Sequence, residues 1–90
     1  MVTLVAKTTA NVAGDHGSWR LASDREGSRS VITTVTLRIE GENEQGFHLI
    51  KSPDGFFTAD DWFLTIDEAF DAAEECFGVR RQDWVDDTAR

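Results

Sequence analysis

The spacing of apolar residues changes once along this 90-residue chain, near Thr65, from alternation to a helical repeat. Before that point, the run 31–40 is rich in β-branched residues, and its second half alternates between apolar and polar positions. After it, apolar residues recur every three or four positions, as in one face of a helix: they are Ile66, Ala69, Phe70, Ala73 and Phe77. This order predicts an α+β fold, in which an antiparallel sheet of three to five strands packs on one C-terminal amphipathic helix.

The run 31–40 is the clearest strand, and its alternation directs four side chains to one face: Thr33, Val35, Leu37 and Ile39. Shorter runs bounded by turn residues predict further strands: 19–24, 47–51 and 56–59. Residues 1–18 are expected to form an edge strand followed by a mobile loop, and residues 85–90 a frayed tail. A chain of this length is expected to form a single domain over residues 1–90.

The expected helix has a signal at each end. Thr65 and Glu68 have the spacing of a capping box, in which the Thr hydroxyl accepts from the third backbone N–H and the Glu side chain reaches back. Gly78 follows the last apolar position and can adopt the left-handed conformation that ends many helices. The sequence therefore predicts a helix that begins after Thr65 and ends before Gly78.

Acidic residues are concentrated in the last third of the chain. The net charge is -8, and residues 60–90 contain ten acidic residues against three arginines. A surplus of this sign argues against nucleic acids and anionic membranes as partners and favours a basic protein. The residues expected to make that contact lie on the outer face of the helix or just before it: Asp60, Asp61, Asp71, Glu74 and Glu75.

Catalytic and metal-binding patterns are weak. His48 falls within an expected strand, and Cys76 lies near the helix C-terminus, whose negative dipole end disfavours a thiolate. The acidic pairs do not have the spacing of a calcium loop, and no serine or cysteine lies in a nucleophile motif. We therefore expect a protein with no catalytic residue, metal or cofactor. An enzyme that uses His48 with neighbouring acids ranks third among the alternatives.

One helix can cover only one face of the sheet. The opposite face is expected to carry Thr34, Thr36 and Arg38, with His48 and Ile50, and to be either solvated or buried against a partner or a second copy. Two tryptophans flank the helix, Trp62 and Trp84. They are expected either to clamp the helix ends to the sheet or to serve as exposed anchors.

The segment from Trp62 to Trp84 has the pattern W-x2-T-x2-EA-x3-A-x3-FGV-x4-W. This pattern resembles the ending of small uncharacterised bacterial proteins, in which a short sheet precedes a capped helix and a late tryptophan. Some of them are similar to immunity proteins of bacterial toxin systems. The resemblance implies the fold and an acidic, partner-binding domain, and it brings no catalytic or ligand residues.

Together these features predict a cytoplasmic, non-enzymatic interaction module, immunity- or inhibitor-like, that binds a basic protein. The cytoplasmic assignment rests on the absence of a secretory signal pattern near Met1. The alternative is a structural homodimer formed through the uncovered face of the sheet.

Overall fold

The computed structural model describes residues 1–15, 18–22 and 30–87. These described residues form six strands, one α-helix and one short 3₁₀ helix. In chain order these are β1 (Val2–Asp15), β2 (Ser18–Leu21), β3 (Ser30–Glu42), β4 (Gly46–Pro53), β5 (Ala59–Phe63), α1 (Ile66–Phe77), η1 (Arg81–Asp83) and β6 (Val85–Asp86). The α+β class is confirmed.

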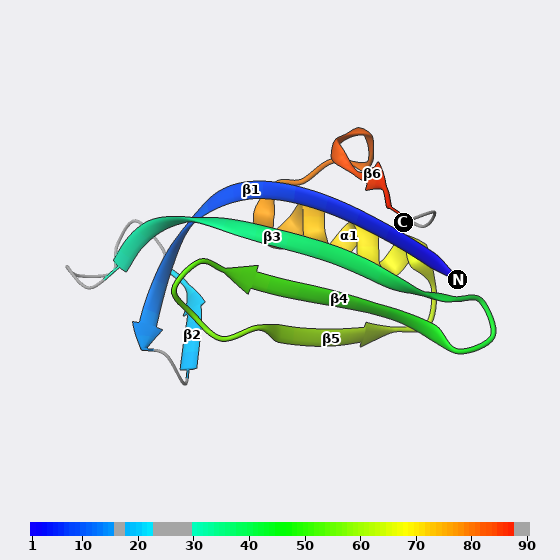
Figure 1. Cartoon of the computed structure of the whole chain (residues 1–90), viewed down its shortest axis with the longest axis horizontal. Coiled ribbons are helices and arrows are strands. Elements are labelled where there is room, and N and C mark those ends of the chain that lie inside the picture. The colour runs from blue at the N-terminus through cyan, green and yellow to red at the C-terminus, as the bar shows by residue number, and fades with distance from the viewer. Residues whose placement is uncertain (16–17, 23–29, 88–90) are drawn as a thin grey trace.

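All strands belong to one antiparallel sheet in the order β2-β1-β3-β4-β5, and β6 pairs with the beginning of β1. The helix α1 lies across one face of this sheet, and β6 runs along the edge of β1 (Figure 1). The described strands exceed the expected three to five by one because residues 85–86 also pair with β1.

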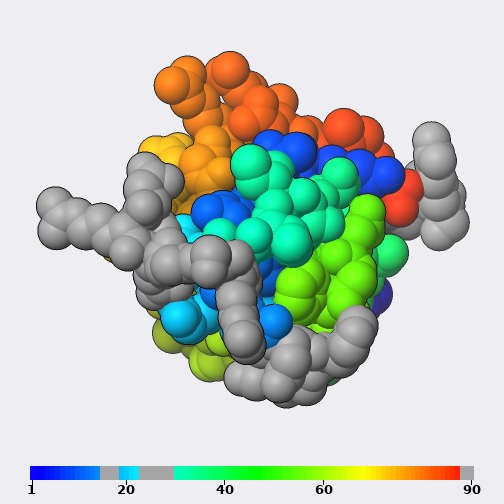
Figure 2. Space-filling view, turned by 90° about the vertical axis from the view of Figure 1, so that its left-hand side faces the viewer, coloured from blue at the N-terminus to red at the C-terminus, as the bar shows by residue number. Residues whose placement is uncertain are grey.

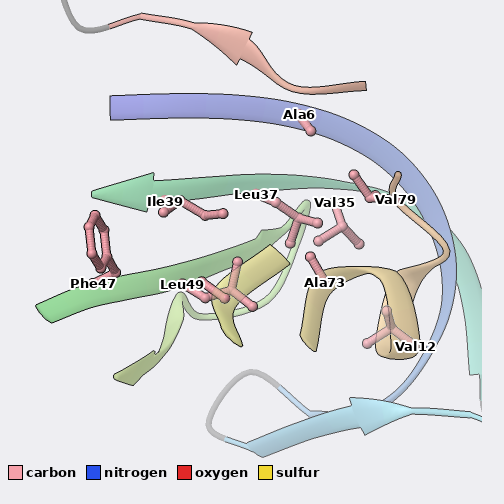
Figure 3. Close-up of a cluster of buried hydrophobic side chains, with 10 residues drawn as sticks. Ala6, Val12, Val35, Leu37, Ile39, Phe47, Leu49, Ala73 and Val79 are labelled. Atoms are coloured by element: carbon pink, nitrogen blue, oxygen red, sulfur yellow. The ribbon is translucent and has the colours of Figure 1, made fainter. Parts of the chain in front are cut away.

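The core lies between α1 and one face of the sheet (Figure 3). The alternation predicted for β3 is confirmed, since Val35, Leu37 and Ile39 are fully buried. From the helix, Ala69 and Ala73 are fully buried, and their small side chains let the helix backbone approach the sheet closely. Other buried apolar residues complete the cluster: Ala6, Val12, Phe47, Leu49 and Val79.

Both predicted ends of the helix are confirmed. Thr65 is the N-cap, and its Oγ1 accepts a hydrogen bond from the backbone N–H of Glu68 at 3.2 Å. The Glu68 side chain reaches back to this hydroxyl, which donates to Oε1 at 3.2 Å, and not to the Thr65 backbone N–H expected in a capping box. Gly78 ends the helix with φ 70°, and its N–H donates to the carbonyl of Glu74 at 2.8 Å. Local sequence therefore specifies the helix boundaries.

The N-terminal segment differs from the expected edge strand and loop. β1 is 14 residues long and pairs with β3 without interruption from Val2 to Ala13. Small residues occupy the inward positions between Leu4 and the fully buried Val12, which weakens the alternation typical of a strand: they are Ala6, Thr8 and Ala10. Residues 16–17 of the expected loop lie outside the described residues.

The C-terminal segment also differs from the expected frayed tail. Val85 and Asp86 form β6 opposite Val5 and Leu4, and the N–H of Asp87 donates to the carbonyl of Thr3 at 2.8 Å. Residues 88–90 lie outside the described residues. Backbone pairing with β1 therefore holds 85–87 in place.

Two other strands are shifted from their expected positions. The strand expected over 56–59 is instead β5, which pairs with β4 from Ala59 to Phe63. The strand expected over 19–24 is β2, of which residues 23–24 lie outside the described part. The shift of β5 decides where Asp60, Asp61 and Trp62 lie.

Candidate functional site

Three of the five acidic residues predicted to contact a partner lie together on α1. Asp71, Glu74 and Glu75 are all exposed on the side of the helix that faces away from the sheet. Glu74 and Glu75 fall in the last turns of the helix, and the last turn carries no basic residue. Within the part of the chain that the structure describes, neither has an ion-pair partner. The helix therefore presents uncompensated negative charge at its C-terminal end.

Asp71 differs from Glu74 and Glu75 because an arginine side chain lies close to it. Arg81 of η1 reaches back to the helix and places Nη1 2.9 Å from Asp67 Oδ1 and Nη2 3.8 Å from Asp71 Oδ1. The guanidinium carbon also lies 4.9 Å from the centre of the Phe70 ring. Arg81 thus offsets the charge of Asp67 and Asp71, whereas Glu74 and Glu75 have no ion-pair partner among the described residues.

Asp60 and Asp61 point to opposite faces of the sheet because they are consecutive residues of β5. Asp61 lies opposite the buried Leu49, on the helix side, and its Oδ2 accepts from Lys51 Nζ at 2.5 Å. Asp60 lies on the uncovered face, with both oxygens 3.1 Å from His48 Nδ1. The five predicted residues are therefore not one patch: Asp60 is separated from the α1 acids by the sheet.

The face of the sheet opposite α1 carries the residues expected there: Thr34, Thr36, Arg38, His48 and Ile50. Arg38 donates to Glu40 Oε1 from Nη2 at 2.7 Å. Trp62 also lies on this face, 53% exposed, and its Nε1 donates to the carbonyl of Gln45 at 3.1 Å. The sequence predicts Trp62 at the end of the helix, whereas the pairing of β5 with β4 as far as Phe63 places it on the sheet.

The two tryptophans that flank the helix take different roles. Trp84 packs its ring edge-to-face on Phe70 of α1, with centroids 6.0 Å apart, so this tryptophan clamps the helix. Trp62 is on the other side of the sheet and does not contact the helix end in this way. Trp62 is therefore the large aromatic residue of the uncovered face.

His48 lies at a shallow hollow of about 220 Å³ on the same face. Glu40 and Glu42 also line it, and Asp60 orients the imidazole from the neighbouring strand. A carboxylate beside a histidine is the arrangement of an oriented general base. The residues lining this hollow supply no hydroxyl or thiol nucleophile, however. Among the described residues, no group of three or more potential ligands is arranged to hold a metal ion.

No family model, curated protein or solved structure matches this chain. In the segments that the structure describes, the one α-helix is too short to cross a bilayer.

Proposed function

We propose that the protein is a non-enzymatic module that binds a basic protein partner through the outer face of α1. The observation that carries this proposal is the position of Glu74 and Glu75 at the C-terminal end of the helix. Negative side chains there oppose the negative end of the helix dipole, at a cost of about 0.3–1 kcal/mol each. A cationic partner surface would remove that cost, so the arrangement favours binding over stability of the free helix.

The overall charge supports the same proposal. A net charge of -8 speeds encounter with a basic surface, and the effect falls as salt screens it. The small size and acidic surface suit an immunity- or inhibitor-like protein that covers a basic site on a toxin or enzyme. Asp71 lies at the rim of this contact, since Arg81 approaches it at 3.8 Å.

The test compares two variants with the same change of charge. Glu74→Gln with Glu75→Gln neutralises the helix acids, and Glu42→Gln with Glu44→Gln neutralises two exposed acids around the β3–β4 turn. A partner is captured from cells that produce the protein and is then purified, and its association rate with each variant is measured at several salt concentrations.

We expect the helix variant to slow association at least tenfold and to reduce its salt dependence, while the control variant stays within about threefold of the parent. Equal effects of the two variants would show that the association rate depends on net charge alone and not on the helix face. A partner that binds the helix variant at the parental rate would overturn the proposal.

The uncovered sheet face supports a second candidate function, a homodimer. Trp62 is half exposed there diagonally across from Ile50, and Val5 and Val85 lie on the same face beyond Arg38. Light scattering over a range of protein concentrations tests this candidate. A dimer that Trp62→Ala converts to a monomer supports it, and a monomer at every concentration excludes it.

A further inference from the structure

The edge of β1 that faces away from β3 is only partly paired. β6 covers Leu4 and Val5, and β2 covers β1 from Val12 onward. Between them, no strand in the described part of the chain pairs with residues 6–10 on this side. At roughly 3.4 Å per residue, this gap is about 17 Å long. A single extended segment of about five residues would therefore fill the gap.

The register shows which main-chain groups face the gap. On this edge the carbonyl of Thr3 accepts from Asp87 and the carbonyl of Asn11 accepts from Ala22. Because N–H and C=O groups of a strand point the same way at every second residue, those of Lys7 and Thr9 also face this edge. Apart from a long 3.4 Å hydrogen bond from Thr8 Oγ1 to the Thr9 carbonyl, no described residue bonds to them. These groups form a template for one more strand.

Little in the sequence of this edge protects it from pairing. Natural edge strands are usually blunted by charges, proline or a bulge. Residues 6–10 contain one charge, Lys7, and no proline, and their pairing with β3 has no bulge. The opposite edge of the sheet, β5, carries the charged pair Asp60 and Asp61. An added strand is therefore favoured at β1.

A hollow of about 420 Å³ lies where β6 leaves the edge. Its lining includes Ala6 and Lys7 on one side and Asp83 and Val85 on the other. In the space-filling view, the orange segment after α1 rises beside the blue surface of β1 (Figure 2). Ala6, almost fully buried, lines this hollow where an apolar side chain of an incoming strand can pack, and Asp83 can meet a basic residue at the end of that strand.

A second copy of this chain does not fit the gap. Each β1 is flanked by its own β2 and β6, so two such edges would block each other before their gaps could meet. A free extended segment carries no flanking strands and can therefore enter the gap. Both β2 and β6 run antiparallel to β1. A segment that lies between them and runs in the same direction begins beside Ala22 and ends beside η1.

We propose that the gap over residues 6–10 of β1 binds an extended segment of the partner by strand addition. This inference rests on the proposed function, because it takes the occupant from the same basic partner. The segment runs antiparallel to β1, places apolar side chains opposite Ala6, Thr8 and Ala10, and ends in a basic residue beside Asp83.

The first test is amide hydrogen exchange in the free protein. The amides of Lys7 and Thr9 are expected to exchange at least a hundredfold faster than those of Ala6 and Thr8, which point toward β3. Equal protection of all four amides would show that the edge is covered and would overturn the proposal.

The second test uses the peptide acetyl-VTVTVRK-amide, whose threonines pair with Lys7 and Thr9 in the proposed register. Its matched control has the same side chains but carries methyl groups on both threonine nitrogens. We expect the parent peptide to shift the NMR signals of residues 5–11 with a dissociation constant in the millimolar range or below. We expect it also to protect the amides of Lys7 and Thr9. The methylated peptide is expected to bind at least tenfold more weakly, and equal binding of the two peptides would refute strand addition.

A pair of protein variants completes the design. Thr9→Pro removes an N–H that faces the gap and no hydrogen bond to β3, whereas Thr9→Val keeps the N–H. Thr9→Pro is expected to weaken peptide binding at least tenfold and Thr9→Val less than threefold. The Glu74/Glu75 variant should bind the peptide as the Glu42/Glu44 control does. Failure at the gap and failure of the acidic helix face are therefore separate results.

Discussion

The indole ring of Trp62 lies over the backbone of Gly46, in the space that a side chain on residue 46 would occupy. Gly46 begins β4 with φ 86°, and the indole N–H is fixed by the adjacent carbonyl of Gln45. The absence of a side chain at one position thus sets the orientation of the largest aromatic residue on the uncovered face.

Replacement of Gly46 by alanine should destabilise the fold more than replacement of Gly55. Both glycines have nearly the same positive φ, at 86° and 88°, but a Cβ on Gly55 meets nothing within 4 Å. Gly55→Ala therefore measures backbone strain alone, about 1–2 kcal/mol. Gly46→Ala must also displace the Trp62 ring. It should therefore lower the free energy of unfolding, measured in urea, by at least about 1 kcal/mol more than Gly55→Ala does. The excess should disappear in a Trp62→Ala background, and an excess that persists there would contradict this explanation.

Removal of the helix cap should lower stability by a small, defined amount. Thr65→Ala deletes the hydroxyl that accepts from the N–H of Glu68, at an expected cost of about 1 kcal/mol in the free energy of unfolding. Thr65→Ser keeps an equivalent hydroxyl and should remain within about 0.5 kcal/mol of the parent. Equal losses in the two variants would mean that the Thr methyl group, rather than the cap, is responsible.

Arg81 should stabilise the folded protein through two interactions that respond differently to salt. Its ion pairs with Asp67 and Asp71 are exposed, and such pairs contribute about 0.2–1 kcal/mol. Its contact with the Phe70 ring is less sensitive to screening. We expect Arg81→Ala to lower the free energy of unfolding by about 1 kcal/mol at low salt. At about 1 M salt, where the screening length is about 3 Å, we expect a smaller but nonzero loss. A loss that vanishes at high salt would exclude a contribution from the ring contact.

The helix could be predicted in full from the sequence because its signals are local. Thr65 and Glu68 mark the beginning, Gly78 marks the end, and the apolar stripe defines the buried face within twelve residues. The same spacing placed Asp71, Glu74 and Glu75 on the outer face, where the structure also has them. No distant segment was needed for either inference.

The extent of β1 could not be predicted in this way. Asn11 and Gly14 favour a turn, and the small inward residues conceal the alternation that would indicate a strand. The strand is determined instead by pairing with β3, which joins Val2 to Gly41. Partners this far apart leave no signal within a short window of sequence.

The position of β5 explains why the predicted contact residues are divided. Its pairing with β4 begins at Lys51 and Ala59, three residues later than the start of the strand expected from the apolar residues Phe56 and Phe57. Once Asp60 and Asp61 are consecutive strand residues, they must point to opposite faces. The hydrogen-bonding partner, not the residue pattern, decides this detail.

The pairing of β1 with both early and late parts of the chain has a consequence for folding. Contacts between residues far apart in sequence slow folding, because the intervening chain must be closed into a loop first. During synthesis β1 emerges before its partners β2, β3 and β6, and β6, which pairs with its edge at Leu4 and Val5, follows all the other strands. This part of the β1 edge therefore stays open to other chains until α1 and η1 have also been made.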